Sequence, residues 1–83
     1  DKMQVQNGGT FHLKGSIHPK IEPEVAFYIK SELKGKVSRE DVLDATEAVC
    51  AALEILDSRY EGFKYFSMED VISDNSSSSH YIL

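Results

Sequence analysis

The sequence predicts a small α+β fold that is mainly β, with the coarse order β-β-α-β-α-β. Two observations predict it. Apolar and polar side chains alternate through residues 20–30, which is the period of a β-strand. Two serines also stand where helix N-caps are expected, one before an apolar helical pattern and one before a short acidic segment. With 83 residues, the chain can form at most one small domain or part of a larger one.

The first two strands are expected before residue 31. Residues 7–9, Asn-Gly-Gly, are a turn signal, and the alternation through Phe11 and Leu13 suggests a hairpin or a strand entry. The stronger candidate is KIEPEVAFYIK, residues 20–30. Because Pro23 cannot donate a backbone hydrogen bond, that end of the strand is expected at a sheet edge, at a bulge or in the first turn.

A helix is expected after Ser38, which is a good N-cap with Asp41 three residues later in a variant of the capping box. Apolar residues then follow at helical spacing: Val42, Ala45 and Val49. Periodicity leaves open whether the helix continues through Leu56 or gives way to a buried strand. The length of the stretch favours a strand over about Ala52–Ser58.

The last part of the chain is expected to hold a short helical turn, a loop and a strand. Ser67 is a second N-cap before an acidic turn. Ser76–Ser79 is a run of four serines, which predicts a loop, and His80–Leu83 has the composition of a final strand.

Composition excludes several functions. There are 14 acidic and 9 basic residues, a net charge of −5, which argues against nucleic acid or an anionic membrane surface as partner. No stretch approaches the roughly 18 apolar residues of a transmembrane helix, and no signal peptide pattern opens the chain. Cys50 is the single cysteine, so no internal disulfide is expected and a cytoplasmic location is the natural expectation.

Glu22 and Glu24 are the first candidates for a functional site. On a strand, residues two apart point to the same side, roughly 7 Å apart along the backbone, and their carboxylates can converge on one ion. Hard cations such as Mg²⁺ take oxygen ligands of this kind. A solvated strand face is the simpler interpretation of the pair alone, since glutamate is mostly exposed.

Glu54 adds a third carboxylate in an apolar setting, ALEIL. A free carboxylate there would be costly to bury unless it were paired or bound to a metal. On a helix, however, Glu54 could simply be exposed. The residues by themselves leave both interpretations open.

Other polar clusters have ordinary structural explanations. Asp57 and Arg59 in DSRY are expected to form an ion pair or a turn cap rather than to act in catalysis. Asp74, Asn75 and the serines after them could bind a substrate carboxylate or carbonyl, or form an ordinary turn. The three histidines lack the spacing of a zinc site, and Cys50 has no neighbour that suggests a nucleophile.

Four blocks occur together between about His18 and Leu83, namely HPKIEPEVAF, ALEILDSRY, FKY and DNSSS. In this order and spacing they closely resemble the 2-hydroxypentadienoate hydratase and 4-oxalocrotonate decarboxylase family, part of the fumarylacetoacetate hydrolase superfamily. The resemblance implies a fumarylacetoacetase C-terminal-like fold. It also implies that three glutamates are the ligands of a Mg²⁺ or Mn²⁺ ion: Glu22, Glu24 and Glu54. The block DNSSS resembles the loop that lines the substrate site, which maps onto Asn75, Ser76 and Ser77.

DSRYEGFKY looks more like the decarboxylases of that family than the hydratases. The resemblance therefore implies metal-dependent decarboxylation of 4-oxalocrotonate (2-oxohex-3-enedioate) to 2-oxopent-4-enoate and CO₂, in the meta-cleavage degradation of aromatic compounds. One alternative is 2-oxopent-4-enoate (vinylpyruvate) hydratase, and an alternative of another class is a non-catalytic acidic interaction module. The implied partners are a small 2-oxo acid substrate and, for the full-length protein, further copies of itself or a hydratase–decarboxylase complex.

The departure from the family is length, because its members are much longer. Their acid–base lysine and aspartate lie upstream of the matching segment, and Asp1 is too near the start to be assigned that role. The absence of an initiator methionine and the apolar ending HYIL favour the same interpretation. Residues 1–83 are thus expected to be a single partial domain, a central slice of a longer enzyme that is inactive alone.

Overall fold

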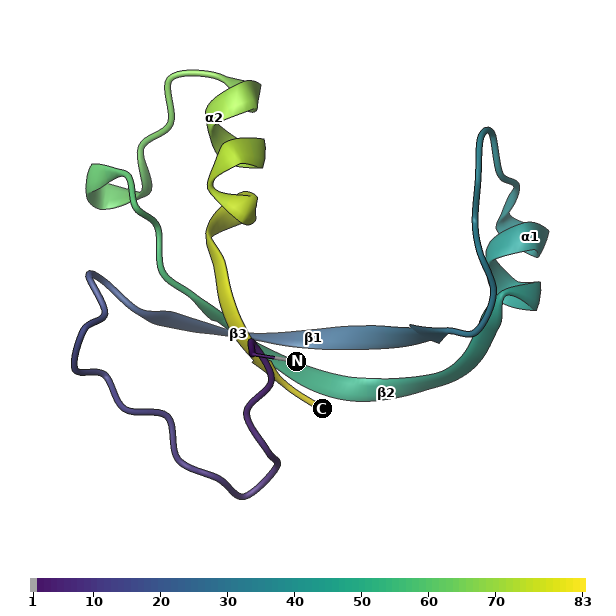
Figure 1. Ribbon diagram of the computed structural model, residues 1–83, viewed down its shortest axis with the longest axis horizontal. Coiled ribbons are helices and arrows are strands. Elements are labelled where there is room, and N and C mark those ends of the chain that lie inside the picture. Colours follow the sequence, from purple (N-terminus) through teal and green to yellow (C-terminus); the bar gives the residue numbers. More distant parts are fainter. Residues whose placement is uncertain (1) are drawn as a thin grey trace.

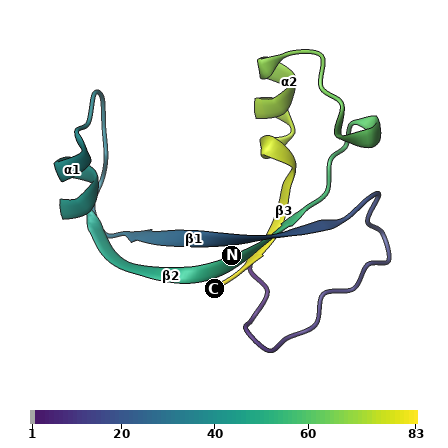
Figure 2. The same ribbon diagram turned by 180° about the vertical axis from the view of Figure 1, so that it is seen from behind.

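The computed structural model describes residues 2–83, so Asp1 lies outside the described part of the chain. The chain forms a three-stranded antiparallel sheet in the order β1-β2-β3, with short helices beside it (Figures 1 and 2). The elements in chain order are β1 (Lys20–Ile29), α1 (Arg39–Asp44), β2 (Thr46–Leu56), α2 (Met68–Ser73) and β3 (Ser78–Ile82), with 3₁₀ turns at Glu61–Phe63 and Asn75–Ser77. This confirms the mixed, mainly β architecture that the sequence predicts.

The long β1–β2 pair is the frame of the molecule (Figure 1). β1 pairs with β2 along its whole length, from Lys20 opposite Leu56 to Ile29 opposite Thr46. The segment with α1 joins these strands at one end, and α2 leads into β3 near the other. β3 pairs only with residues 53–56 of β2, and on its other side Gln4 forms an isolated parallel bridge with Tyr81.

The expected strand through Phe11 and Leu13 is not formed, and the observed order is β-α-β-α-β. Gly8 adopts a left-handed φ of 79°, and the amide of Gly9 donates to the carbonyl of Gln6 at 2.8 Å. These contacts make a turn with no second strand beside it. Phe11 instead packs its ring against His80, with the ring centroids 4.9 Å apart.

The helix after Ser38 is shorter than its apolar spacing predicts, and β2 begins at Thr46 rather than near Ala52. α1 ends at Asp44, and the Thr46 hydroxyl donates to the carbonyl of Val42 at 2.6 Å. Extended backbone suits β-branched residues, and pairing with β1 satisfies the backbone groups that a longer helix would have satisfied internally. Tertiary pairing therefore overrides the local helical pattern.

Both predicted N-caps are confirmed. The Ser38 hydroxyl accepts the amide of Asp41 at 3.1 Å, and the Asp41 carboxylate accepts the amide of Ser38 at 2.7 Å, which completes the capping box. Ser67 accepts the amide of Asp70 at the start of α2. The predicted loop over Ser76–Ser79 is wrong in its second half, because β3 already begins at Ser78, where backbone pairing with β2 starts.

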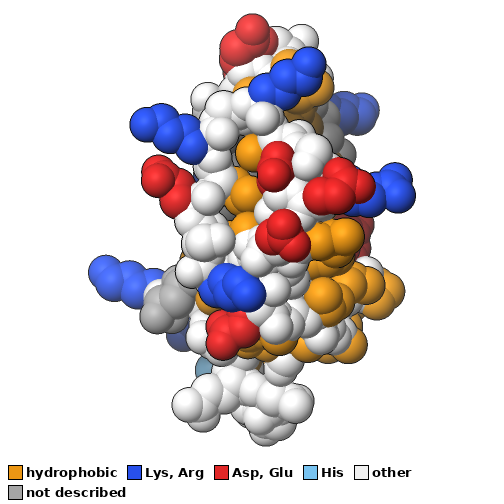
Figure 3. Space-filling model, turned by 90° about the vertical axis from the view of Figure 1, so that its right-hand side faces the viewer, with side chains coloured by type: hydrophobic (Ala, Val, Ile, Leu, Met, Phe, Trp, Pro, Cys, Tyr) orange, Lys and Arg blue, Asp and Glu red, His pale blue; other side chains and the backbone are white. Residues whose placement is uncertain are grey.

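Little apolar surface is buried within residues 2–83. The buried apolar residues among them are Ala45, Ile55 and Leu56. Seen from the side that carries α1, charged side chains are scattered over a surface on which apolar side chains are also exposed (Figure 3). In the described part of the chain, no helix has the length and apolarity needed to span a membrane.

Candidate metal centre

Three carboxylates from two neighbouring strands come together on the sheet. Glu22 lies directly opposite Glu54 in the β1–β2 register, and Glu24 follows two residues later on the same face of β1. One carboxylate oxygen from each lies within 4.8 Å of the other two. The structure therefore brings together all three glutamates that the resemblance implied as ligands.

The geometry of this cluster fits a divalent cation. Oxygens bound to one Mg²⁺ at 2.0–2.1 Å lie at most about 4.2 Å apart, and the corresponding limit for Ca²⁺ is about 5 Å. For all three oxygens to bind one Mg²⁺, rotation of the glutamate side chains would have to draw them closer together than 4.8 Å. Glu22 and Glu24 are exposed and Glu54 is half-buried, so the ion would keep open positions for water or a substrate.

Electrostatics also favours a cation at this position. Like charges directly opposite each other on neighbouring strands destabilise a sheet, and Glu24 adds a third negative charge. Within residues 2–83, none of the three glutamates forms an ion pair with lysine or arginine. A bound cation would convert this repulsion into attraction.

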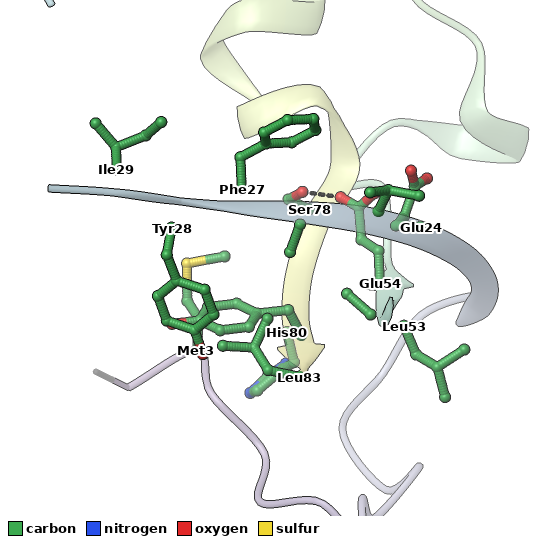
Figure 4. A pocket seen from close by; sticks show the side chains of 14 residues that line it. Met3, Glu24, Phe27, Tyr28, Ile29, Leu53, Glu54, Ser78, His80 and Leu83 are labelled. Atoms are coloured by element: carbon green, nitrogen blue, oxygen red, sulfur yellow. Dashed lines mark hydrogen bonds between the residues drawn. The ribbon is translucent and has the colours of Figure 1, made fainter. Parts of the chain in front are cut away.

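Ser78 contacts the carboxylate cluster, and sequence reasoning missed it. Its hydroxyl donates a hydrogen bond to Oε1 of Glu54 (Figure 4). The run of serines pointed to this segment, but only the register of β3 shows which serine reaches the carboxylates.

An open cavity of about 560 Å³ extends from the carboxylates along the sheet. Glu24, Glu54 and Ser78 supply polar lining, and apolar or aromatic side chains such as Phe27 and Tyr28 line the rest (Figure 4). Such a cavity can hold a small molecule with one polar end near the cluster.

The three residues that the resemblance placed at the substrate site do not line this cavity in the described structure. Asn75 and Ser76 are exposed, whereas Ser77 is buried and its hydroxyl donates to the carbonyl of Ser76 at 2.6 Å. They form the turn that leads directly into Ser78. Their contact with a substrate stays a prediction.

The turn over Asn75–Ser77 is strained. All three residues have left-handed backbones, with φ of 52°, 51° and 61°, a conformation that costs roughly 1–2 kcal/mol for each residue other than glycine. Ser77 holds it in place, since its amide donates to the carbonyl of Asp74 at 2.9 Å and its carbonyl accepts the amide of Asp57 at 2.8 Å. Strain of this kind persists where surrounding contacts fix it.

A buried carboxylate, Asp74, anchors the start of this turn. It accepts hydrogen bonds from Arg59 Nη1 at 2.7 Å, from the Tyr65 hydroxyl at 2.6 Å and from the Ser58 hydroxyl at 3.0 Å. The hydrogen bonds from Arg59 and then from Tyr65 lower the pKa of Asp74 to about 2. Asp74 is therefore ionised at neutral pH although its side chain is buried.

Asp57 ties the end of β2 to the start of β1. Its carboxylate accepts the amides of His18 at 2.7 Å and Ile17 at 2.9 Å, and these hydrogen bonds lower the pKa of Asp57. The ion pair expected between Asp57 and Arg59 is not formed, because Arg59 pairs with Asp74 instead. Asp57 accepts backbone amides, as a capping residue does. Both contacts lie at the end of the sheet that carries Glu22 and Glu54.

Three carboxylates on an antiparallel sheet, beside an open cavity, offer oxygen donors of the kind that a hard divalent cation prefers. Known enzymes contain a segment that is similar in sequence to this chain. No family model matches the chain. It is 46% identical over 81 residues to a 4-oxalocrotonate decarboxylase from Pseudomonas sp. and 41% identical over 86 residues to a 2-hydroxyhexa-2,4-dienoate hydratase from Comamonas testosteroni. These alignments cover 98% and 100% of this chain, but 31% and 32% of the relatives.

A solved structure gives the same answer. 4-Oxalocrotonate decarboxylase from Pseudomonas putida G7, complexed with magnesium and adipate, superposes with a TM-score of 0.87 at 38% identity, over 98% of this chain and 31% of that one. The resemblance seen in the sequence is confirmed: the homologues of this chain are 4-oxalocrotonate decarboxylases and related hydratases. The chain spans about a third of their length.

Proposed function

We propose that this chain is the cation-binding segment of a 4-oxalocrotonate decarboxylase, and that Glu22, Glu24 and Glu54 hold a Mg²⁺ or Mn²⁺ ion. The convergence of the three carboxylates within 4.8 Å carries the proposal. Similarity to decarboxylases supports the choice of enzyme, and magnesium in the structure of one of them supports the choice of ion. Adipate in that structure is a six-carbon dicarboxylate, as 4-oxalocrotonate is.

A bound cation would supply a Lewis acid to the carboxylate and keto oxygens of a 2-oxo acid. The part of this chain is to hold the ion and to shape one wall of the cavity, with Asn75, Ser76 and Ser77 near the substrate. Residues 1–83 act as one partial domain of the enzyme. The acid–base lysine and aspartate implied by the resemblance belong to the remainder of the enzyme, as do the contacts that make further copies or a hydratase–decarboxylase complex.

Titration of the full-length protein with Mn²⁺, followed by calorimetry, tests the cation site. Glu22→Gln, Glu24→Gln and Glu54→Gln are each expected to weaken binding by more than about tenfold, because even residues that only contact metal ligands contribute 10–100-fold. Glu47→Gln is the matched control, an exposed glutamate on the same sheet outside the cluster. Unchanged Mn²⁺ affinity in all three variants would refute the site.

The same variants report on the repulsion within the cluster. Without divalent cations, Glu22→Gln is expected to raise the stability of the full-length protein slightly, by about 0.5 kcal/mol, because it removes one of two opposed like charges. With Mg²⁺ present, the unaltered protein should be stabilised by the ion and the variant should not. Thermal melting in EDTA and in Mg²⁺ measures both effects.

Hydration of 2-oxopent-4-enoate is the second candidate activity, since a hydratase is 41% identical to the chain. Release of CO₂ from 4-oxalocrotonate by the full-length protein identifies the decarboxylase. Loss of 2-oxopent-4-enoate without CO₂ release identifies the hydratase. An acidic interaction module would show neither reaction and no saturable Mn²⁺ binding.

A further inference from the structure

The pairing of β3 with β2 contains a bulge next to the carboxylate cluster. Glu54 lies opposite Tyr81 and Ile55 opposite His80, but Leu56 lies opposite Ser78. The register shifts between Ile55 and Leu56, so Ser79 is an extra residue with no partner on β2. A bulge of this kind bends a strand and redirects its side chains.

The bulge decides which face of the sheet Ser78 occupies. With regular pairing, Ser78 would lie opposite Asp57, on the face away from Glu54, because neighbouring residues alternate between faces. The extra residue places Ser78 opposite Leu56 instead. Leu56 and Glu54 are two residues apart, so their side chains share one face, and Ser78 joins them there.

The consequence of this shift is a direct contact. The Ser78 hydroxyl donates to Oε1 of Glu54 (Figure 4). An ionised carboxylate has about four lone-pair positions, so this hydrogen bond fixes its rotation while leaving positions free for an ion. The preceding residue, Ser77, is anchored at its carbonyl by the amide of Asp57, which holds the start of β3 against the end of β2.

We propose that Ser78 is a positioning residue for the cation site, which orients the Glu54 carboxylate through its hydroxyl. The proposal rests on the proposed function, since it needs Glu54 to be a ligand. Partners that orient metal ligands typically contribute 10–100-fold to metal affinity. The contribution of Ser78 should be of this size, and it should require the hydroxyl and not merely the volume of the side chain.

Mn²⁺ binding to the full-length protein tests the proposal. Ser78→Ala is expected to weaken Mn²⁺ binding by about 10-fold or more, whereas Ser78→Thr, which keeps the hydroxyl, should stay within about threefold of the unaltered protein. Ser79→Ala is the matched control, since the Ser79 hydroxyl contacts His80 Nδ1 at 2.7 Å, and it should bind Mn²⁺ normally. The electron paramagnetic resonance spectrum of bound Mn²⁺ should change in Ser78→Ala and not in Ser78→Thr.

The possible failures are distinguishable. Normal Mn²⁺ affinity in Ser78→Ala, together with weak binding in Glu54→Gln, would overturn the role of Ser78 and leave the cation site intact. Equal losses in Ser78→Ala and Ser78→Thr would attribute the effect to packing and would also overturn it. Absence of Mn²⁺ binding by the unaltered protein would overturn both this inference and the proposed function.

Discussion

The ionised carboxylate of Asp74 anchors the start of the turn Asn75–Ser77, which leads into Ser78. This carboxylate is buried, yet it is charged at neutral pH because Arg59 and two hydroxyl groups donate to it. Burying a charge is tolerated only with such partners. The same residue caps the end of α2 and accepts the amide of Ser77 at its carbonyl. Asp74 therefore connects the ion pair with Arg59, the end of α2 and the strained turn Asn75–Ser77.

Acid is expected to destabilise the protein through Asp74. Its pKa is about 2 in the folded chain, below the ordinary value of 3.8, so its contribution is fully present above about pH 4 and is lost as the pH falls from about 4 to 2. Asp74→Asn should be less stable than the unaltered protein at pH 7. It should also lose less stability over the acid range, and melting temperatures of the full-length protein from pH 2 to 7 measure both effects. Melting temperatures that fall equally with pH in Asp74→Asn and in the unaltered protein would contradict this role.

The residues of the candidate site differ in how far they can be predicted from the sequence. Glu22 and Glu24 could be placed on one face by alternation alone, because both lie on a strand with a clear period of two. Glu54 could be placed with them only through the family resemblance, because periodicity left helix and strand open and a strand assignment alone does not give its pairing register. Ser78 could not be singled out at all, because its face depends on a one-residue bulge that has no distinct signal among four successive serines.

Among the elements, the two helix starts and the extent of β1 were predictable, whereas the limits of β2 and β3 were not. Ser38 and Ser67 act through local hydrogen bonds three residues away, so the sequence contains the whole signal. The start of β2 at Thr46 depends on pairing with β1, which lies about twenty residues earlier in the chain. The residues around Phe11 alternate as a strand should, but they have no strand to pair with.

The turn Asn75–Ser77 gives a prediction at the level of an element. Ser76 is exposed and left-handed, so Ser76→Gly should stabilise the full-length protein by about 1 kcal/mol by removing the steric cost. Ser76→Val should destabilise it by at least as much, because a β-branched side chain is a genuine outlier in this conformation. The free energy of unfolding obtained from urea denaturation measures both changes, and the m-values of the variants should equal that of the unaltered protein.

The control for this pair is Ser31→Gly, at an exposed residue that is not left-handed. There, glycine only adds freedom to the unfolded chain and should be neutral or slightly destabilising. A stabilisation of equal size at both positions would show that the turn stores no strain.

On the scale of the whole molecule, the balance between buried and exposed apolar side chains is unusual. Ala45, Ile55 and Leu56 are the apolar residues buried among residues 2–83. Large apolar side chains on β1 are instead exposed, including Val25 at 64% and Phe27 at 50%. A face of this kind normally marks an interface. The chain spans about a third of the length of its relatives. If it is part of an enzyme of that length, as proposed, the remaining residues are expected to cover this face.

Phe27→Ala in the full-length protein tests this expectation. Removing a half-exposed ring should lower the free energy of unfolding only slightly. Removing a ring that the rest of the full-length protein buries should lower it by about 3 kcal/mol or more. We expect the larger loss in urea denaturation, with Lys36→Ala in an exposed loop as the neutral control.

Residues 1–83 produced alone should bind a hydrophobic dye and unfold without a sharp transition, because so little apolar surface is buried. The opposite outcome would be an isolated chain that unfolds cooperatively and binds no dye, with a loss of less than about 1 kcal/mol in Phe27→Ala. It would show that the three-stranded sheet is stable by itself.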